Sequence, residues 1–185
     1  MDDLYVDGLS TWVPLDLDAP ASDNAEQLMQ HFGTDEATAT AAAGIGGIAA
    51  QLGQDDTDGT VTLAAWVRTL SDDELIPLEI AALRGVAHAG DDVSELAELL
   101  AAGDPPHGST ERGEIDTASG PAHTLRWRSV VTGTVDREIH EDNAVVWLRP
   151  DRGYAVVLSC HSVDLVSAVS LPGALHQLAA GVHGL

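Results

Sequence analysis

Residues 110–161 read TERGEIDTASGPAHTLRWRSVVTGTVDREIHEDNAVVWLRPDRGYAVVLSCH and contain the strongest indication of the fold class. They include four runs rich in strand-forming residues, the third with a break near residues 142–143 as an alternative. The turns between the runs, ASGP, VTGT and RPDRG, have hairpin length, and strands joined by hairpins pair antiparallel. The sequence therefore predicts an antiparallel meander, with strands at Thr110 to Thr117, Ala122 to Val131, Val135 to Leu148 and Tyr154 to His161.

Helical patterns flank further strand-like runs on both sides of the meander. Residues 22–33, 34–53, 91–103 and 172–182 repeat apolar side chains at helical spacing, while residues 4–17, 60–70 and 75–86 are typical of strands. In the second helix the apolar stripe is predicted to consist of Ala41, Ile45, Ile48 and Leu52. Adjacent strands with the helices set apart indicate an α+β fold, a mainly antiparallel sheet with helices packed on its faces. We expect a single domain over residues 1–185, with an internal break near 103–109.

The composition limits the classes of partner. The chain contains thirty acidic residues, eight arginines and no lysine, which gives a net charge of −22. Such a surface repels phosphate backbones and anionic lipids, so we expect neither nucleic acid nor a membrane as partner.

The acidic N-terminus shows no export signal, no apolar run is long enough to span a membrane, and the single cysteine fits a reducing compartment. These features favour a cytoplasmic location. The same acidity fits adaptation to high salt or a GC-rich genome equally well.

The sequence LSCHSVD, residues 158–164, resembles a nucleophile beside its base. Neighbouring side chains of a strand point to opposite faces, however, so Cys160 and His161 should point apart. The apolar residues of this strand alternate in phase with Cys160. We therefore expect Cys160 to be buried and unreactive.

Histidines in the meander raise the question of a metal site. If neighbouring strands pair in simple hairpins, His140 and His161 meet on one face, with Asp164 close by. Two imidazoles and a carboxylate can hold Zn²⁺ or Fe²⁺. Solvent-facing histidines are the alternative, and His176 and His183, on the last helix, are predicted to be exposed. We expect no cofactor.

Two arginines form a positive stripe in the acidic chain. Arg126 and Arg128 fall on the same face of one strand, with Trp127 on the other. They can pair with acids of the neighbouring strand, or they can contact an anionic ligand or an acidic partner.

Other patterns have structural explanations. The glycines of GIGG, residues 44–47, lie inside a helical pattern without the preceding strand that a dinucleotide site needs. The acidic pairs Asp55-Asp56, Asp72-Asp73 and Asp91-Asp92 lie at turns or helix starts, where carboxylates cap free N–H groups.

Three segments together resemble a known fold family. These are STWVPLDLDAPASDNAEQLMQHF near the start, GPAHTLRWRS in the middle and RPDRGYAVVLSCHSVDLVSAVSLPGALHQLAAGVHGL at the end. Their layout resembles actinobacterial proteins that are similar to the PsbP-like α/β/α sandwich. Members of that fold include photosystem assembly factors and a Ran-binding nuclear import protein, so the resemblance implies an accessory or binding role. No catalytic residues come with it.

The sequence thus favours a non-enzymatic module that acts through protein contacts, as a homodimer or with another protein. A small-molecule or metal-dependent hydrolase on the open sheet face is the alternative. A third hypothesis, from the net charge, is an acidic mimic that occupies a nucleic-acid site on another protein.

Overall fold

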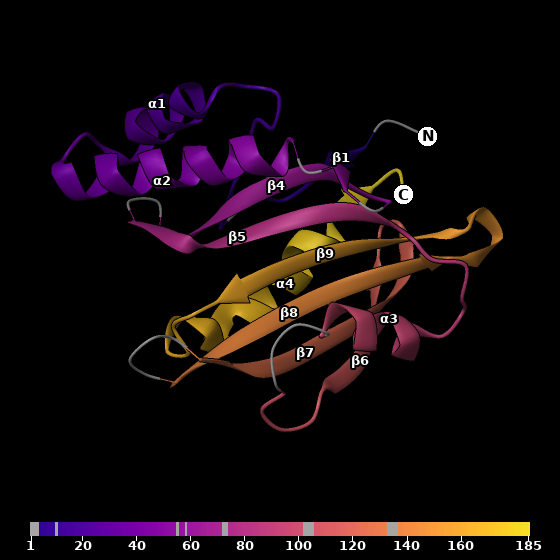
Figure 1. The fold of residues 1–185 in the computed structure, drawn as a ribbon. Coiled ribbons are helices and arrows are strands. Elements are labelled where there is room, and N and C mark those ends of the chain that lie inside the picture. The colour runs from indigo at the N-terminus through magenta and orange to yellow at the C-terminus, as the bar shows by residue number, and fades with distance from the viewer. Residues whose placement is uncertain are drawn as a thin grey trace. The chain divides into compact units, whose positions relative to one another are not determined.

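The predicted meander is present as four strands that pair antiparallel in chain order. They are β6 (Glu111–Thr117), β7 (Gly120–Thr132), β8 (Arg137–Arg149) and β9 (Tyr154–Ser162) (Figure 1). The pairing of β8 with both neighbours continues through Asp142 and Asn143, so this strand has no break there. The chain is α+β and mainly antiparallel, as predicted.

The computed structural model describes residues 4–9, 11–54, 56–57, 59–71, 74–101, 106–132 and 137–185. The chain divides into two compact units, which we call the helical unit (Leu9–Gly85) and the meander unit (Met1–Gly8 with Val86–Leu185). Their boundary lies inside β5 (Glu74–Ala87) and not near residues 103–109, of which 102–105 are outside the described residues.

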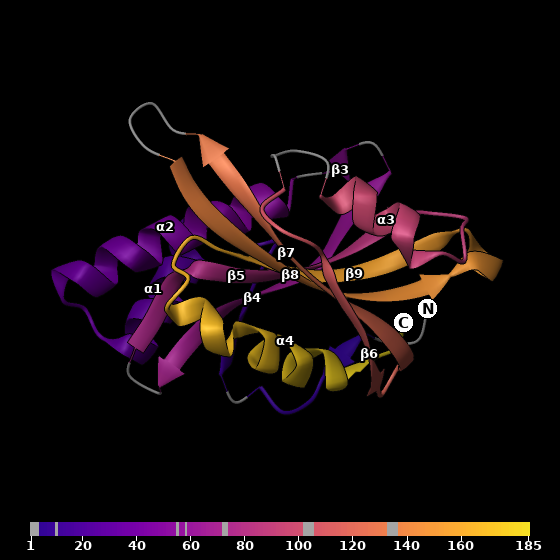
Figure 2. The same ribbon diagram turned by 90° about the horizontal axis from the view of Figure 1, so that it is seen from below.

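In the meander unit, two helices cover opposite faces of the four strands (Figures 1 and 2). On one face, Leu96 and Ala97 of α3 (Val93–Leu100) pack into a cluster with β7, β8 and β9. On the other face lies α4 (Leu171–Ala180), which contacts β8 and β6. The predicted stripe of the last helix is buried, at Leu175, Leu178, Ala179 and Val182. Two 3-10 turns, η1 (Pro150–Arg152) and η2 (Ser167–Ser170), lead into β9 and α4.

The two ends of the chain meet in the meander unit. The short strands β1 (Tyr5–Val6) and β10 (Val182–His183) pair antiparallel. The His183 ring stacks on Tyr5 with centroids 4.4 Å apart, and its Nε2 lies 3.0 Å from Asp7 Oδ2. The expected exposure of His183 and His176 is therefore wrong, since both rings are partly buried by packing that involves residues far away in sequence.

The helical unit packs two helices on one face of its strands. These strands are β2 (Trp12–Leu15), β4 (Thr60–Ser71) and β5, with β3 (Asp56–Thr57) paired to β4, and the helices are α1 (Ala21–Phe32) and α2 (Glu36–Leu52). Their shared core includes Leu28 of α1, Ile45 of α2 and Val67 of β4. None of the described helices has the length and apolarity needed to cross a membrane.

The buried side of α2 differs from the predicted stripe. Ala42, Ile45, Ala49 and Leu52 are buried, whereas Ile48 is 37% exposed. The cause is the close contact with α1: a Cβ on Gly46 would lie 2.2 Å from the carbonyl oxygen of Ala21. Only glycine allows this approach, and it turns the Gly46 side of the helix toward α1.

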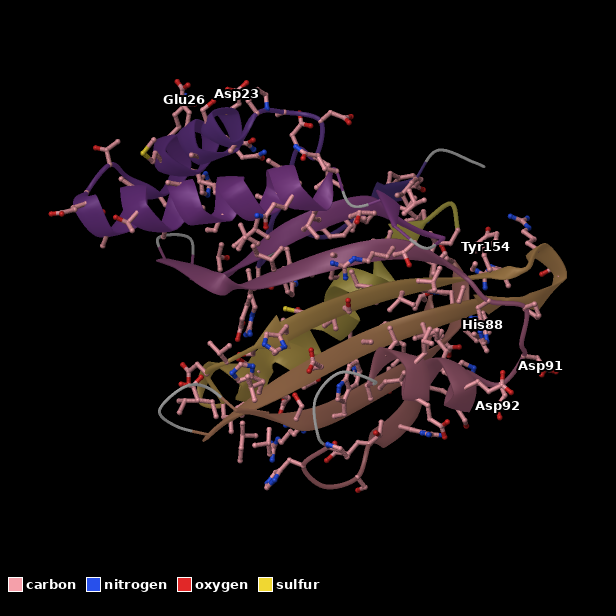
Figure 3. All side chains as sticks on the ribbon, viewed as in Figure 1. Asp23, Glu26, His88, Asp91, Asp92 and Tyr154 are labelled. Carbon is pink, nitrogen blue, oxygen red and sulfur yellow. The ribbon has the colours of Figure 1, made fainter. Side chains whose placement is uncertain are left out.

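Helix starts agree only partly with the predictions. Asp92 caps α3 as expected, its carboxylate accepting from the N–H of Ser94 at 2.7 Å, and Figure 3 shows it with Asp91 just before that helix. Asp35 caps α2, its carboxylate accepting from the N–H groups of Ala37 and Thr38. The start of α1 follows Pro20 without any side-chain cap, and Asp23 and Glu26 lie on its outward side.

A buried ion pair joins β4 and β5 in the helical unit. Arg68 bonds to Glu79, and their side chains are 5% and 1% exposed. We predict that Glu79→Gln lowers the free energy of unfolding by about 3–5 kcal/mol, because it removes the buried carboxylate charge that pairs with the Arg68 guanidinium. Urea denaturation measures this change. The exposed Glu98→Gln is the control, and an Arg68→Met, Glu79→Leu double variant should regain most of the loss; equal effects of Glu79→Gln and Glu98→Gln would contradict the prediction.

Candidate functional site

The register of β7, β8 and β9 sorts the polar side chains of the meander onto two faces. Asp142 stands opposite Trp127 on one side and His161 on the other, whereas the next residue, Glu141, stands opposite Arg128. Because successive side chains alternate, His140, Asp142 and His161 share one face, which we call the histidine face. Arg126, Arg128 and Glu141 share the other, the arginine face.

On the arginine face, two guanidinium groups converge on one buried carboxylate. Oε2 of Glu141 accepts from Nη2 of Arg126 at 2.9 Å and from Nε of Arg128 at 2.8 Å. Oε1 lies 3.4 Å from the amide nitrogen of Asn143. The Glu141 side chain is 1% exposed, while those of Arg126 and Arg128 are 30% and 44% exposed. The predicted pairing with an acid of the neighbouring strand is therefore present.

Burial alone would raise the pKa of Glu141, but the hydrogen bonds from Arg126, Arg128 and Asn143 outweigh it and hold the pKa below its ordinary value of 4.5. Its hydrogen bond raises the pKa of Arg126 in turn. Glu141 is thus a fixed anion that holds both arginines in place.

Two cavities open beside these arginines. One, of about 190 Å³, is bordered by His107, Gly108, Ser109 and Glu111 together with Arg126, Trp127 and Arg128. The other, of about 170 Å³, extends toward α4 and reaches His176, whose pKa is lowered by burial. Ser109 and His107 both border the first cavity, but no hydrogen bond joins their side chains within the described ranges.

On the histidine face, His140 and His161 meet as predicted. Nε2 of His161 lies 3.1 Å from Nδ1 of His140. The outer nitrogens face carboxylates: Nδ1 of His161 is 2.8 Å from Asp142 Oδ1, and Nε2 of His140 is 3.4 Å from Glu138 Oε2. The four side chains form a chain of hydrogen-bonding groups along the surface of β8 and β9.

The number of ring protons that these contacts require follows from the hydrogen-bonding capacity of each group. Each carboxylate only accepts, so each outer ring nitrogen must carry a proton, and the contact between the rings needs a third. Two neutral imidazoles carry two protons in all. The three contacts are therefore satisfied together when the third proton lies on one of the two inner ring nitrogens, between His140 and His161.

The third predicted metal ligand lies elsewhere. The carboxylate of Asp164 accepts from the backbone N–H of Val166 at 2.9 Å, in the turn that leads to η2. The inner nitrogens of His140 and His161 face each other rather than a common point. Within the described ranges, no group of three or more histidine, cysteine or acidic side chains is arranged to hold a metal ion.

Cys160 lies on the face opposite His161, as predicted. It is buried at 2% exposure, whereas the His161 side chain is 47% exposed. The two side chains cannot act as a nucleophile and its base.

No protein-family model, curated protein or solved structure matches this chain. The PsbP-like resemblance therefore stays a prediction.

The sequence left the acidic partners of the site unassigned. Asp142 and Glu141 were visible beside His140, but the choice of which faces a histidine and which an arginine depends on the strand register. In the observed register Thr132 pairs with Arg137, which places Glu141 opposite Arg128.

Glu141 should make the stability of the protein depend on acid pH. A carboxyl whose folded pKa lies below its unfolded value stabilises the native state above the unfolded pKa, and that stabilisation is lost as the pH falls through the folded pKa. We predict that Glu141→Gln lowers the free energy of unfolding at neutral pH, and that its difference from the wild type shrinks below about pH 4.5. Urea denaturation as a function of pH measures this. A difference that stays constant down to the acid limit, or an equal effect of Glu98→Gln, would contradict it.

Proposed function

We propose that this protein is a non-catalytic binding module that acts through protein contacts, and that the solvent-facing side of α2 is its contact surface. The exposed apolar side of this helix carries the proposal. In line with the single cysteine, we expect the module to work in the cytoplasm without nucleic acid.

The contact surface is a shallow apolar groove of about 740 Å³ along α2. Its borders are Glu36, Ala37, Thr40, Ala41, Gly44, Ile45 and Ile48. After Glu36 the helix has no charged residue up to its end at Leu52. In a chain with net charge −22, a full helix face without charge is a surface from which water is readily displaced.

Contacts within the described residues do not require glycine at two positions of α2. Gly46 is required by the contact with α1, but a Cβ on Gly44 or Gly47 would meet nothing within 4 Å. Glycine inside a helix costs about 0.5–1 kcal/mol relative to alanine. Close approach of a second backbone is the physical gain that offsets this cost, because two helices without side chains between them pack at short distance.

We assign a second copy of the chain as the occupant of the groove. A two-fold contact places the same patch against itself, so both sides are uncharged, small and apolar. Two copies with net charge −22 repel each other elsewhere, and an uncharged contact keeps that repulsion at its weakest. Salt should therefore strengthen the dimer by screening, whereas it would weaken a complex with a basic partner.

The dimer is tested by substitutions on two sides of α2. Ala41→Glu places a carboxylate in the groove, while Ala43→Glu places one at an exposed position about 200° further round the helix. We expect Ala41→Glu to raise the dissociation constant at least tenfold, because the symmetric contact sets like charges together, and Ala43→Glu to change it little. Sedimentation equilibrium at low and high salt measures both.

Gly44→Ala distinguishes the effect of this glycine on helix stability from its effect on the dimer contact. It should raise the unfolding free energy of the monomer by about 0.5–1 kcal/mol through helix propensity and still weaken the dimer by holding the helices apart. A wild type that is monomeric at every concentration and salt, or equal effects of Ala41→Glu and Ala43→Glu, would reject the second copy as occupant.

A hydrolase is the alternative, and the contact between His140, His161 and Asp142 is the observation that favours it. Because the inner ring nitrogens face each other, we predict no stoichiometric Zn, Fe or Mn in protein purified without tag or chelator, and no ester hydrolysis that is lost in a His140→Ala, His161→Ala variant. Elemental analysis and an ester panel test this, with His31→Ala as the control for a surface histidine. Stoichiometric metal that only the double variant loses would replace the binding-module proposal with the enzyme.

A further inference from the structure

On the arginine face, Arg128 has hydrogen-bonding capacity that its partners leave unused. A guanidinium carries five N–H donors, and in the described part of the chain Arg128 uses Nε alone, on Glu141. Its side chain is 44% exposed at the border of the 190 Å³ cavity. Glu141 therefore holds the guanidinium through Nε, while the two terminal nitrogens remain available to a ligand in the cavity.

The neighbouring loop completes one side of the cavity. The N–H of His107 donates to the carbonyl of Arg128 at 2.8 Å, and Pro106 bridges to Ser129, so the loop is tied to β7. Gly108 has φ +89°, a left-handed conformation that glycine adopts at little cost, and it turns the chain toward Ser109. Ser109 forms no hydrogen bond within the described ranges, so its hydroxyl is a further donor at the rim.

From this geometry we infer that the cavity between the 107–109 loop and Arg128 binds the carboxylate of a small organic acid or of a peptide C-terminus. The planar fork of arginine matches a carboxylate with two parallel hydrogen bonds. The site is independent of the α2 surface, since it belongs to the other unit and rests on different residues.

Charge and size favour a carboxylate over a phosphate. The two arginines carry +2 and Glu141 carries −1, so the cluster has a charge of +1 once Glu111 is displaced; one carboxylate neutralises this charge, whereas a dianion leaves one negative charge uncompensated. Glu111 is 72% exposed and contacts Arg126 at 3.5 Å, the longest and weakest bond of the cluster. A bound carboxylate can displace it. A volume of about 190 Å³ lies below the 300–1,000 Å³ of drug-sized pockets, so it suits one acidic group on a short stem.

Because Arg128 is proposed to bind the carboxylate and Glu111 to compete with it, substitutions of these two residues should change the affinity for the ligand in opposite directions. Arg128→Gln removes the fork and should weaken binding about tenfold or more. Glu111→Gln removes the competing carboxylate and should strengthen binding several-fold. Arg112→Gln is the matched control, because it removes the same charge from the neighbouring strand, where Arg112 contacts Ser94 on the other face.

The experiment is an NMR titration of the full chain at constant ionic strength, following the Arg128 Nε–H and Ser109 amide signals. The probes are sodium acetate, N-acetylalanine, N-acetylalanine amide and sodium phosphate. We expect saturable, millimolar binding of acetate and N-acetylalanine, and none of the amide. Tighter binding of N-acetylalanine than of acetate would indicate a peptide C-terminus as the ligand, whereas tighter binding of acetate would indicate a small free acid.

Several results would overturn the inference. These are the absence of saturation by either carboxylate, tighter binding of phosphate than of acetate, and an equal loss of affinity in Arg112→Gln and Arg128→Gln. Weaker binding by Glu111→Gln would overturn it as well. Because Glu111→Gln is expected to gain affinity, a folding defect of Arg128→Gln cannot imitate the predicted result.

Discussion

The antiparallel register of β7, β8 and β9 is the constraint on which both polar sites depend. Three consecutive residues of β8, His140, Glu141 and Asp142, point alternately to opposite faces. A shift of one residue would exchange the faces and place the histidines against the arginines. In the observed register Ala144 and Val146 pack in the cluster with α3 on the histidine face, while Val145 and Trp147 are buried on the opposite face.

Glu141 shows how a buried charge is maintained in this sheet. Burial disfavours its ionised form, and two arginines from the neighbouring strand compensate. The compensation is larger than one negative charge needs, since two cations converge on one carboxylate oxygen. That excess explains why a positive site persists in a chain with net charge −22, and why the exposed Glu111 joins the cluster only at its edge.

The two proposed surfaces differ in the interaction that would stabilise the bound partner. On α2 the gain comes from small apolar side chains and from glycines that permit close packing, so shape decides the partner. On the arginine face the gain comes from a fixed guanidinium fork, so the charge and planarity of the ligand decide.

Local patterns in the sequence predict the four strands of the meander, the α+β class, the burial of Cys160 and the shared face of Arg126 and Arg128. These features depend on local alternation and turn length, which neighbouring residues encode. Other features became visible only in the folded chain: Glu141 pairs with the arginines and Asp142 with His161, Asp164 accepts a hydrogen bond in a turn, and Ile48 of α2 is exposed to solvent. Each of these follows from contacts between distant segments, such as the register of a strand pair or the approach of Gly46 to Ala21, which no local pattern specifies.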